Sequence, residues 1–191
     1  MGIEIFPGAV QFNFPEEVAK KTIRLVNESN KTWVDSSVGS GTVAKHIRSS
    51  LSFDLDALEI SKNEIRPILY DCVKKYSNYY ETPIYRDESL NLLRYESYDK
   101  YEYHVDYGGN MRRSVSCLIY LNPGEYSGGG TNFKHFNYTI NPESPALVLF
   151  PSNYPYLHAA EPVSEGVKYI IVTWMYDESE NLLSTQSCSC Q

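Results

Sequence analysis

Residues 101–106 read Tyr-Glu-Tyr-His-Val-Asp, and this stretch, rich in residues that favour strands, predicts a β-strand. Side chains alternate between the two faces of a strand, so His104 and Asp106 should point to the same side. A second imidazole brought in by a distant strand would complete a set of two histidines and one carboxylate. Such a set holds Fe(II) on one face and leaves the opposite coordination positions open.

The chain from residue 90 onward consists of short strand-like segments separated by turn residues. A short edge strand is expected at residues 3–6. The later strands are expected at residues 90–95, 101–106, 114–121, 131–133, 138–140, 146–150, 156–160 and 168–175. Breaks such as Gly108-Gly109 and Asn141-Pro142 fit β-turns. The series predicts a mainly β fold with a jelly-roll core, also called a double-stranded β-helix.

Helical patterns are confined to the first 89 residues. Pro15 opens a predicted helix that ends near residue 27, because proline is tolerated in a first helical turn. Before the second helix, Ser61 and Glu64 have the spacing of a capping box. Pro67 lacks an N–H group, so the regular part of this helix should begin near residue 63 or 64. We expect these N-terminal helices to pack on one sheet of the jelly roll.

The 191 residues leave room for one domain with a substantial core. We expect a single domain over residues 1–178, in which residues 1–89 form a helical support region and residues 90–178 form the jelly-roll core with the metal site. Residues 179–191 read as a flexible polar tail. Residues 30–50, rich in Ser, Gly and Thr, read as a long loop.

The charge and hydropathy of the chain exclude some classes of partner. A formal net charge of −7 without a basic cluster disfavours nonspecific binding to nucleic acid. No run approaches the roughly 18 apolar residues of a membrane span. The N-terminus lacks the basic start and apolar centre of an export signal. We therefore expect a cytoplasmic protein that binds neither membrane nor nucleic acid.

The four cysteines contain no CxxC pair, so neither a zinc ribbon nor a thioredoxin-type site is indicated. Cys72 and Cys117 have apolar neighbours and should be buried as small hydrophobic residues. Cys188 and Cys190 fall in the polar tail, where a metal-binding or redox role stays open.

Further motifs accompany the strand with His104 in a fixed order. They are Arg113-Ser-Val-Ser-Cys-Leu-Ile-Tyr120, Gly128-Gly-Gly-Thr131-Asn-Phe133, Ala146-Leu-Val-Leu-Phe-Pro151, and His158-Ala-Ala-Glu-Pro-Val followed by Gly166, Lys168 and Trp174. With this combination the chain resembles Fe(II)- and 2-oxoglutarate-dependent dioxygenases of the prolyl 4-hydroxylase type, over residues 90–176. The resemblance implies hydroxylation of a proline in a peptide or protein, with succinate and CO₂ as further products.

The resemblance also implies a role for each site residue. The iron ligands of the family match His104, Asp106 and His158. Lys168 matches the residue that pairs with the distal carboxylate of 2-oxoglutarate, and a buried lysine needs such an anion. Tyr120 matches a hydroxyl donor to the same carboxylate, while Tyr95 and Thr131 match polar residues of the cosubstrate pocket. Fe(II), 2-oxoglutarate and O₂ are therefore expected, with ascorbate as a further candidate.

Two positions depart from the family pattern. Val172 stands where a threonine is common, and Thr173 comes one residue later, on the opposite face of the strand. One hydrogen bond to the cosubstrate is therefore expected to be missing. Tyr103 stands where a proline commonly precedes the first histidine, which affects the expected shape of the substrate more than the chemistry.

Three alternatives stay open on the sequence alone. The first is a 2-oxoglutarate dioxygenase that acts on another residue or on a small molecule. The second is a non-catalytic jelly-roll module that binds metal, since a fold does not fix a function. The third, a zinc hydrolase, is disfavoured because no evident general base accompanies the ligands and Lys168 would have no purpose. The sequence does not indicate an oligomeric state.

Overall fold

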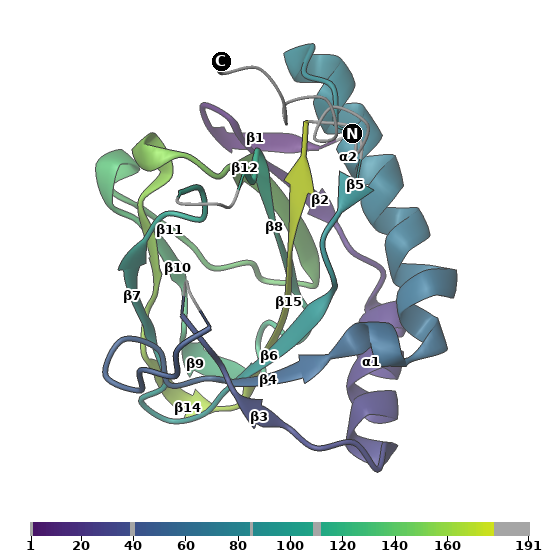
Figure 1. Cartoon of the computed structure of the whole chain (residues 1–191), viewed down its shortest axis with the longest axis vertical. Coiled ribbons are helices and arrows are strands. Elements are labelled where there is room, and N and C mark those ends of the chain that lie inside the picture. The colour runs from purple at the N-terminus through teal and green to yellow at the C-terminus, as the bar shows by residue number, and fades with distance from the viewer. Residues whose placement is uncertain (1, 39–40, 85, 109–111, 178–191) are drawn as a thin grey trace, which may run out of the picture.

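Two antiparallel sheets face each other in the computed structural model, which describes residues 2–38, 41–84, 86–108 and 112–177 (Figure 1). The larger sheet contains, in spatial order, β1 (Ile3–Phe6), β2 (Ala9–Asn13), β12 (Ala146–Pro151), β8 (Val115–Tyr120), β15 (Lys168–Tyr176), β6 (Asn91–Tyr95), β4 (Leu51–Asp54) and β3 (Val34–Asp35), with β5 (Arg86–Asp87) beside β15. The smaller sheet contains β11 (Tyr138–Ile140), β10 (Thr131–Phe133), β13 (His158–Ala160) and β7 (Tyr101–His104). A separate antiparallel pair, β9 (Tyr126–Gly128) and β14 (Val163–Gly166), lies at one end of the two sheets (Figure 1). This arrangement is the expected jelly roll.

The helices α1 (Glu16–Glu28) and α2 (Arg66–Tyr80) cover the outer face of the larger sheet (Figure 1). Alternation along β15 separates two cores. Ile171 and Met175 pack toward the helices, whereas Ile170 and Val172 point between the sheets. Fully burying one such side chain contributes about 1.5–3 kcal/mol, so each layer is held by its own apolar cluster. The prediction that the N-terminal helices pack on one sheet is confirmed.

The start of α2 differs from the predicted capping box. A π-helical turn, Ser61–Ile65, precedes α2, and the backbone N–H of Arg66 bonds to the carbonyl of Ser61. The Ser61 hydroxyl bonds to Asp56 and is not a helix cap. The wider turn has a physical reason, because Pro67 supplies no N–H for the regular ladder.

Within the described ranges, no helix combines the length and apolar character needed to cross a membrane.

Each predicted strand after residue 90 has a counterpart in the structure, but β13 begins at His158 and not at residue 156, and β9 and β14 were not predicted. β10 and β11 have the predicted bounds, but β7 ends at His104 and does not reach Asp106. The backbone N–H of Asp106 bonds to the carbonyl of Ser152, 3.2 Å away, instead of continuing the ladder with β13. Asp106 therefore lies outside the strand that contains His104, whereas the alternation argument required both residues to lie in one strand.

Residues 1–89 contribute more strand than predicted. β2 pairs with β12, and β4 pairs with β6, so this region supplies part of the larger sheet as well as both helices. The predicted loop at residues 30–50 includes the short strand β3. The domain division at residue 90 stays a prediction.

The structure tests some of the predictions for the cysteines and the polar tail, but not those that fall on undescribed residues. Cys72 and Cys117 are buried free thiols, as predicted. Gly109, Cys188, Cys190 and residues 178–191 lie outside the described residues.

Candidate active site

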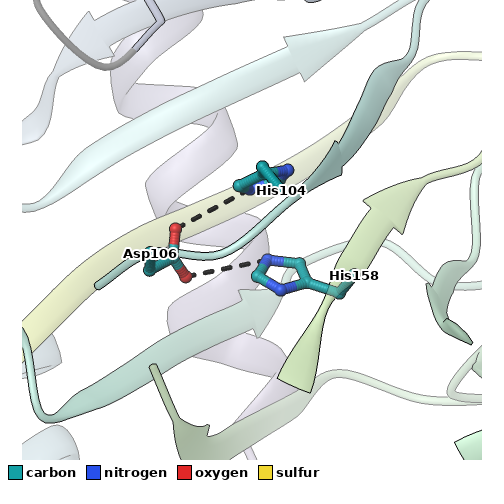
Figure 2. Close-up of side chains that lie close together, drawn as sticks. All are labelled: His104, Asp106 and His158. Atoms are coloured by element: carbon teal, nitrogen blue, oxygen red, sulfur yellow. Dashed lines mark ion pairs between the residues drawn. The ribbon is translucent and has the colours of Figure 1, made fainter. Parts of the chain in front are cut away.

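Three predicted metal ligands converge between the two sheets (Figure 2). His104 ends β7, His158 begins β13, and the antiparallel register places these two histidines opposite each other. Asp106 follows β7 and extends one carboxylate oxygen toward each imidazole. Oδ1 lies 3.7 Å from Nε2 of His104, and Oδ2 lies 3.6 Å from Nε2 of His158. One ligand atom from each residue falls within 4.8 Å of the others.

Main-chain hydrogen bonds fix the orientation of both imidazoles. Nδ1 of His104 lies 2.8 Å from the carbonyl oxygen of Glu102, and Nδ1 of His158 lies 2.9 Å from that of Tyr156. A carbonyl only accepts, so each Nδ1 carries the hydrogen and each Nε2 keeps its lone pair facing Asp106. A hydrogen bond from the nitrogen that does not bind the metal is typical of metal-binding histidines.

Electrostatics give these ligands the charge states that a divalent metal requires. Burial, followed by repulsion from His158, lowers the pKa of His104 to about 3, so its imidazole is neutral. Burial by itself would raise the pKa of Asp106, but His158, His104 and a hydrogen bond from Ser116 outweigh it and lower that pKa. Two imidazole nitrogens and one carboxylate form a donor set that fits Fe(II).

Each imidazole is also packed by a different environment. The ring of Tyr101 stacks on His104 with a centroid distance of 3.6 Å, and the guanidinium of Arg48 lies 4.8 Å from the Tyr101 ring centroid. His158 has an apolar neighbour instead, since Phe150 meets it edge-on at 5.0 Å. Tyr101 thus covers one face of His104 and is itself in contact with Arg48 of the 30–50 segment.

Lys168 lies at the inner end of the same cavity. Its side chain is buried, and its ammonium donates to the carbonyl oxygen of Gly129 at 2.6 Å. The ammonium also lies 5.4 Å from the ring centroid of Tyr95 and 5.2 Å from that of Tyr120. Burial lowers the pKa of Lys168 to about 7, partly opposed by Glu161. A buried cation with neutral neighbours is suited to receive an anion.

The cavity has a volume of about 270 Å³ and brings together most of the predicted site residues. Those that line it are His104, Asp106, His158, Lys168, Tyr95 and Thr131. Tyr120 is fully buried behind this lining, and its hydroxyl donates to Oγ1 of Thr131 at 2.7 Å. Val172 lines the cavity and Thr173 points away, where its hydroxyl bonds to the carbonyl of Glu88. The predicted loss of one polar contact at this position agrees with the geometry.

Comparison with known proteins identifies this arrangement. The family described as the 2OG-Fe(II) oxygenase superfamily matches residues 90–176. That range contains the three metal ligands and Lys168. Residues 90–176 belong to the 2OG-Fe(II) oxygenase superfamily. It is 29% identical to a PKHD-type hydroxylase of Synechococcus sp. (strain CC9902), over 84% of this chain and 72% of that protein.

Solved structures of prolyl hydroxylases have the same fold as this oxygenase. One is a prolyl hydroxylase from Trichoplax adhaerens in complex with a hypoxia inducible factor oxygen degradation domain peptide fragment. It has a TM-score of 0.72 and 21% identity, and the match covers 94% of this chain and 88% of that one. Another is a Pseudomonas putida prolyl-4-hydroxylase, with a TM-score of 0.68, 18% identity, and coverage of 90% and 94%.

As a member of this superfamily, the protein is a 2-oxoglutarate-dependent dioxygenase that uses Fe(II), 2-oxoglutarate and O₂. The zinc hydrolase alternative is thereby set aside. The three possible metal ligands and the buried Lys168 line one cavity.

Arg113, Ser116 and Trp174 belong to the motifs found in the sequence, but the contacts that they make in the oxygenase site, and the participation of Glu88, were not predicted. Arg113 donates through Nε and Nη2 to both carboxylate oxygens of Glu88, each at 2.8 Å, and its guanidinium lies 3.5 Å from the Trp174 ring centroid. Trp174 in turn hydrogen-bonds Asp106. No local signal marks Glu88, which reaches this place because its backbone N–H pairs with the carbonyl of Trp174 on β15. Ser116 carried a usable signal, since it is a polar residue in a buried strand.

Proposed function

We propose that this oxygenase hydroxylates a prolyl residue in a peptide or protein substrate. The observation that carries the proposal is the shared cavity, in which the open-faced ligand set and Lys168 lie together. The proline assignment is supported by the names of related proteins, which include PKHD-type hydroxylases and prolyl hydroxylases. A peptide as substrate is supported by the Trichoplax protein, whose structure holds a peptide fragment.

Each residue of the cavity has a proposed task. His104, Asp106 and His158 hold Fe(II), which with O₂ and 2-oxoglutarate supplies the oxidising chemistry that yields succinate and CO₂. Lys168 binds the distal carboxylate of 2-oxoglutarate, a charge-assisted contact worth about 1.5–3 kcal/mol. Thr131 adds a hydroxyl to that end of the cavity.

The aromatic residues complete this binding pocket. Tyr120 supports the hydroxyl of Thr131 from behind, and the ring of Tyr95 forms a wall beside the ammonium of Lys168. These residues exclude water and orient the cosubstrate, so that the oxidation is directed at the substrate.

The substrate is proposed to enter the cavity past the residues that line it outside the metal and lysine sites. Ser36, Ser37 and Arg48 line the cavity from the 30–50 segment, and Trp174 lines it from β15. Tyr107 directly follows Asp106 and is 52% exposed. Polyproline segments bind aromatic surfaces with little loss of entropy, which favours a proline-containing peptide here. A cavity of about 270 Å³ holds a cosubstrate and one side chain, so the rest of the peptide must lie outside.

Reconstitution and turnover test the proposal together. The protein is loaded anaerobically with Fe(II) and 2-oxoglutarate, and the visible charge-transfer band of the chelate is recorded before O₂ and proline-rich peptides are added. We expect the band, succinate formation stimulated by peptide, and a peptide mass increase of one oxygen atom that is absent when alanine replaces proline. Succinate that no peptide stimulates would disprove the prolyl substrate while keeping the oxygenase. Absence of both band and succinate would indicate a metal-binding module without catalysis.

A further inference from the structure

The position of Asp106 depends on contacts outside its own strand. β7 ends at His104, and the carbonyl oxygen of Ser152 accepts from the backbone N–H groups of Asp106, at 3.2 Å, and Tyr107, at 3.0 Å. The segment after β12 therefore holds the main chain at Asp106. A ligand beyond a strand end needs such ties, because pairing with β13 no longer fixes its direction.

Two buried hydroxyl groups also link this segment to the carboxylate of Asp106 by hydrogen bonds. Ser116 Oγ lies 2.6 Å from Asp106 Oδ2, and Ser152 Oγ lies 2.8 Å from Ser116 Oγ. An ionised carboxylate only accepts, so the single hydroxyl hydrogen of Ser116 is donated to Asp106. Ser152 must then donate to Ser116. The two serines form a one-way chain that ends on Oδ2, and each bond in such a chain strengthens the next.

The two oxygens of Asp106 therefore differ. Each oxygen faces one imidazole, Oδ1 that of His104 and Oδ2 that of His158, but Oδ2 also receives the hydroxyl of Ser116. We propose that Ser116, supported by Ser152, is a positioning residue that restricts Asp106 to one oxygen as a metal ligand. The hydroxyl of Ser116 draws on the acceptor capacity of Oδ2, so Oδ1 becomes the better donor to the ion.

This restriction matters for the open face of the site. A carboxylate can bind a cation through one oxygen or two, and a second oxygen would occupy a position that cosubstrate or O₂ needs. Without Ser116, the carboxylate of Asp106 loses its hydrogen bond on Oδ2 and is held less firmly, although the hydrogen bond with Trp174 remains. The inference rests on the iron site of the proposed function but not on the identity of its substrate, so a failed peptide assay leaves it untouched.

Titration of the metal-free protein with Co(II), followed by its visible absorption, tests the inference without turnover. We expect Ser116→Ala to weaken Co(II) binding by roughly 10- to 100-fold, the usual effect of losing an outer-layer hydrogen bond at a metal site. We also expect the Co(II) band to lose molar absorption as a second carboxylate oxygen joins the ligand shell. Ser116→Thr keeps the hydroxyl and should restore both readouts.

Thr22→Val is the matched control, because Thr22 is a fully buried hydroxyl in α1 that bonds to the carbonyl of Val18 at 2.7 Å, away from the site. It should cost similar stability and leave the Co(II) spectrum unchanged. If Ser116→Ala does not fold, Ser152→Ala removes only the outer hydroxyl and should change the same two readouts to a smaller extent. A folded Ser116→Ala, or in its place a folded Ser152→Ala, with wild-type affinity and spectrum would overturn the proposal.

Discussion

Lys168 donates its ammonium hydrogen to the carbonyl oxygen of Gly129 at 2.6 Å, so the partner of this buried cation is a neutral main-chain group. The carbonyl is available because Gly129 has a φ of +64° within the turn that precedes β10. A Cβ atom at this glycine would lie 3.2 Å from Cδ of Lys168 and crowd the lysine. The single carbonyl of Gly129 does not replace the hydration of an ammonium group. The unliganded protein therefore retains part of the desolvation free energy of Lys168, which a bound anion can offset.

Replacing Lys168 by methionine should therefore stabilise the unliganded protein and abolish cosubstrate binding. The pKa of Lys168 is lowered from 10.5 to about 7, so below pH 7 folding must bury a charge that the unfolded chain keeps in water. We expect Lys168→Met to raise the free energy of unfolding by about 2–4 kcal/mol at pH 7. Denaturant unfolding measures this gain, and titration with 2-oxoglutarate measures the loss of affinity.

The sign of the pH dependence gives this stability prediction a second check. The wild-type protein loses the proton of Lys168 as the pH rises above about 7, so its stability should increase toward pH 10.5 and the advantage of the variant should shrink. Lys100→Met, at a partly exposed lysine paired with Glu102, is the control and should change stability by less than about 1 kcal/mol. A Lys168→Met protein less stable than wild type would show that the ammonium contributes more than its burial costs.

Cosubstrate binding should weaken as the pH rises above 7. Below that value Lys168 already carries its proton, whereas above it each bound dianion must draw a proton onto the lysine. The dissociation constant of 2-oxoglutarate should then rise by up to about tenfold per pH unit between pH 7 and 9. Calorimetry of the Mn(II)-loaded protein in two buffers of different ionisation enthalpy measures the proton uptake directly. No uptake at pH 8 would mean that Lys168 stays charged without its anion.

The site could be predicted from sequence as far as residue identities, but its geometry could not. The resemblance to the dioxygenase family placed His104, Asp106, His158 and Lys168 in one site, because each matches a position in the motifs of that family. The alternation argument nevertheless gave a wrong reason for Asp106, which is held by Ser152 beyond the end of β7. A contact between segments 46 residues apart leaves no local signal.

The fold shows the same division between local and long-range information. β10 and β11 were bounded correctly, since glycines precede one and Asn141-Pro142 follows the other. β4 was not predicted as a strand, because only Phe53 in Leu51–Asp54 is fully buried and the neighbouring sequence is rich in serine. It becomes a strand by pairing with β6, and tertiary pairing often overrides a weak local preference.

Replacing His158 by alanine should reduce Fe(II) affinity by more than about 100-fold, because one of the three protein ligands is lost. The main-chain carbonyl of Tyr156, which orients His158, cannot take its place as a ligand. Anaerobic titration with Fe(II) measures the affinity. His135→Ala is the matched control, because that histidine is exposed on the turn after β10 and should leave binding unchanged. Retention of one tightly bound Fe(II) by His158→Ala would mean that another residue is the third ligand.

The hydroxyls of Tyr120 and Thr131 should act in series rather than side by side. Thr131 lines the cavity, whereas Tyr120 lies behind it and donates its hydroxyl hydrogen to Oγ1 of Thr131, which leaves the Thr131 hydrogen for the cosubstrate. Thr131→Val should therefore weaken 2-oxoglutarate binding by roughly tenfold, about 1.4 kcal/mol. Tyr120→Phe removes only the support and should cost two- to threefold.

The double variant distinguishes this order from two independent contacts. Once Thr131 is valine, the Tyr120 hydroxyl has lost its acceptor, so adding Tyr120→Phe should weaken binding no further. Each single change is isosteric, which makes the pair suitable for a double-mutant cycle. Equal single losses that multiply in the double variant would instead mean that the Tyr120 hydroxyl turns away from Thr131 and contacts the carboxylate itself. In that case the hydrogen bond between the two side chains would belong to the unliganded protein only.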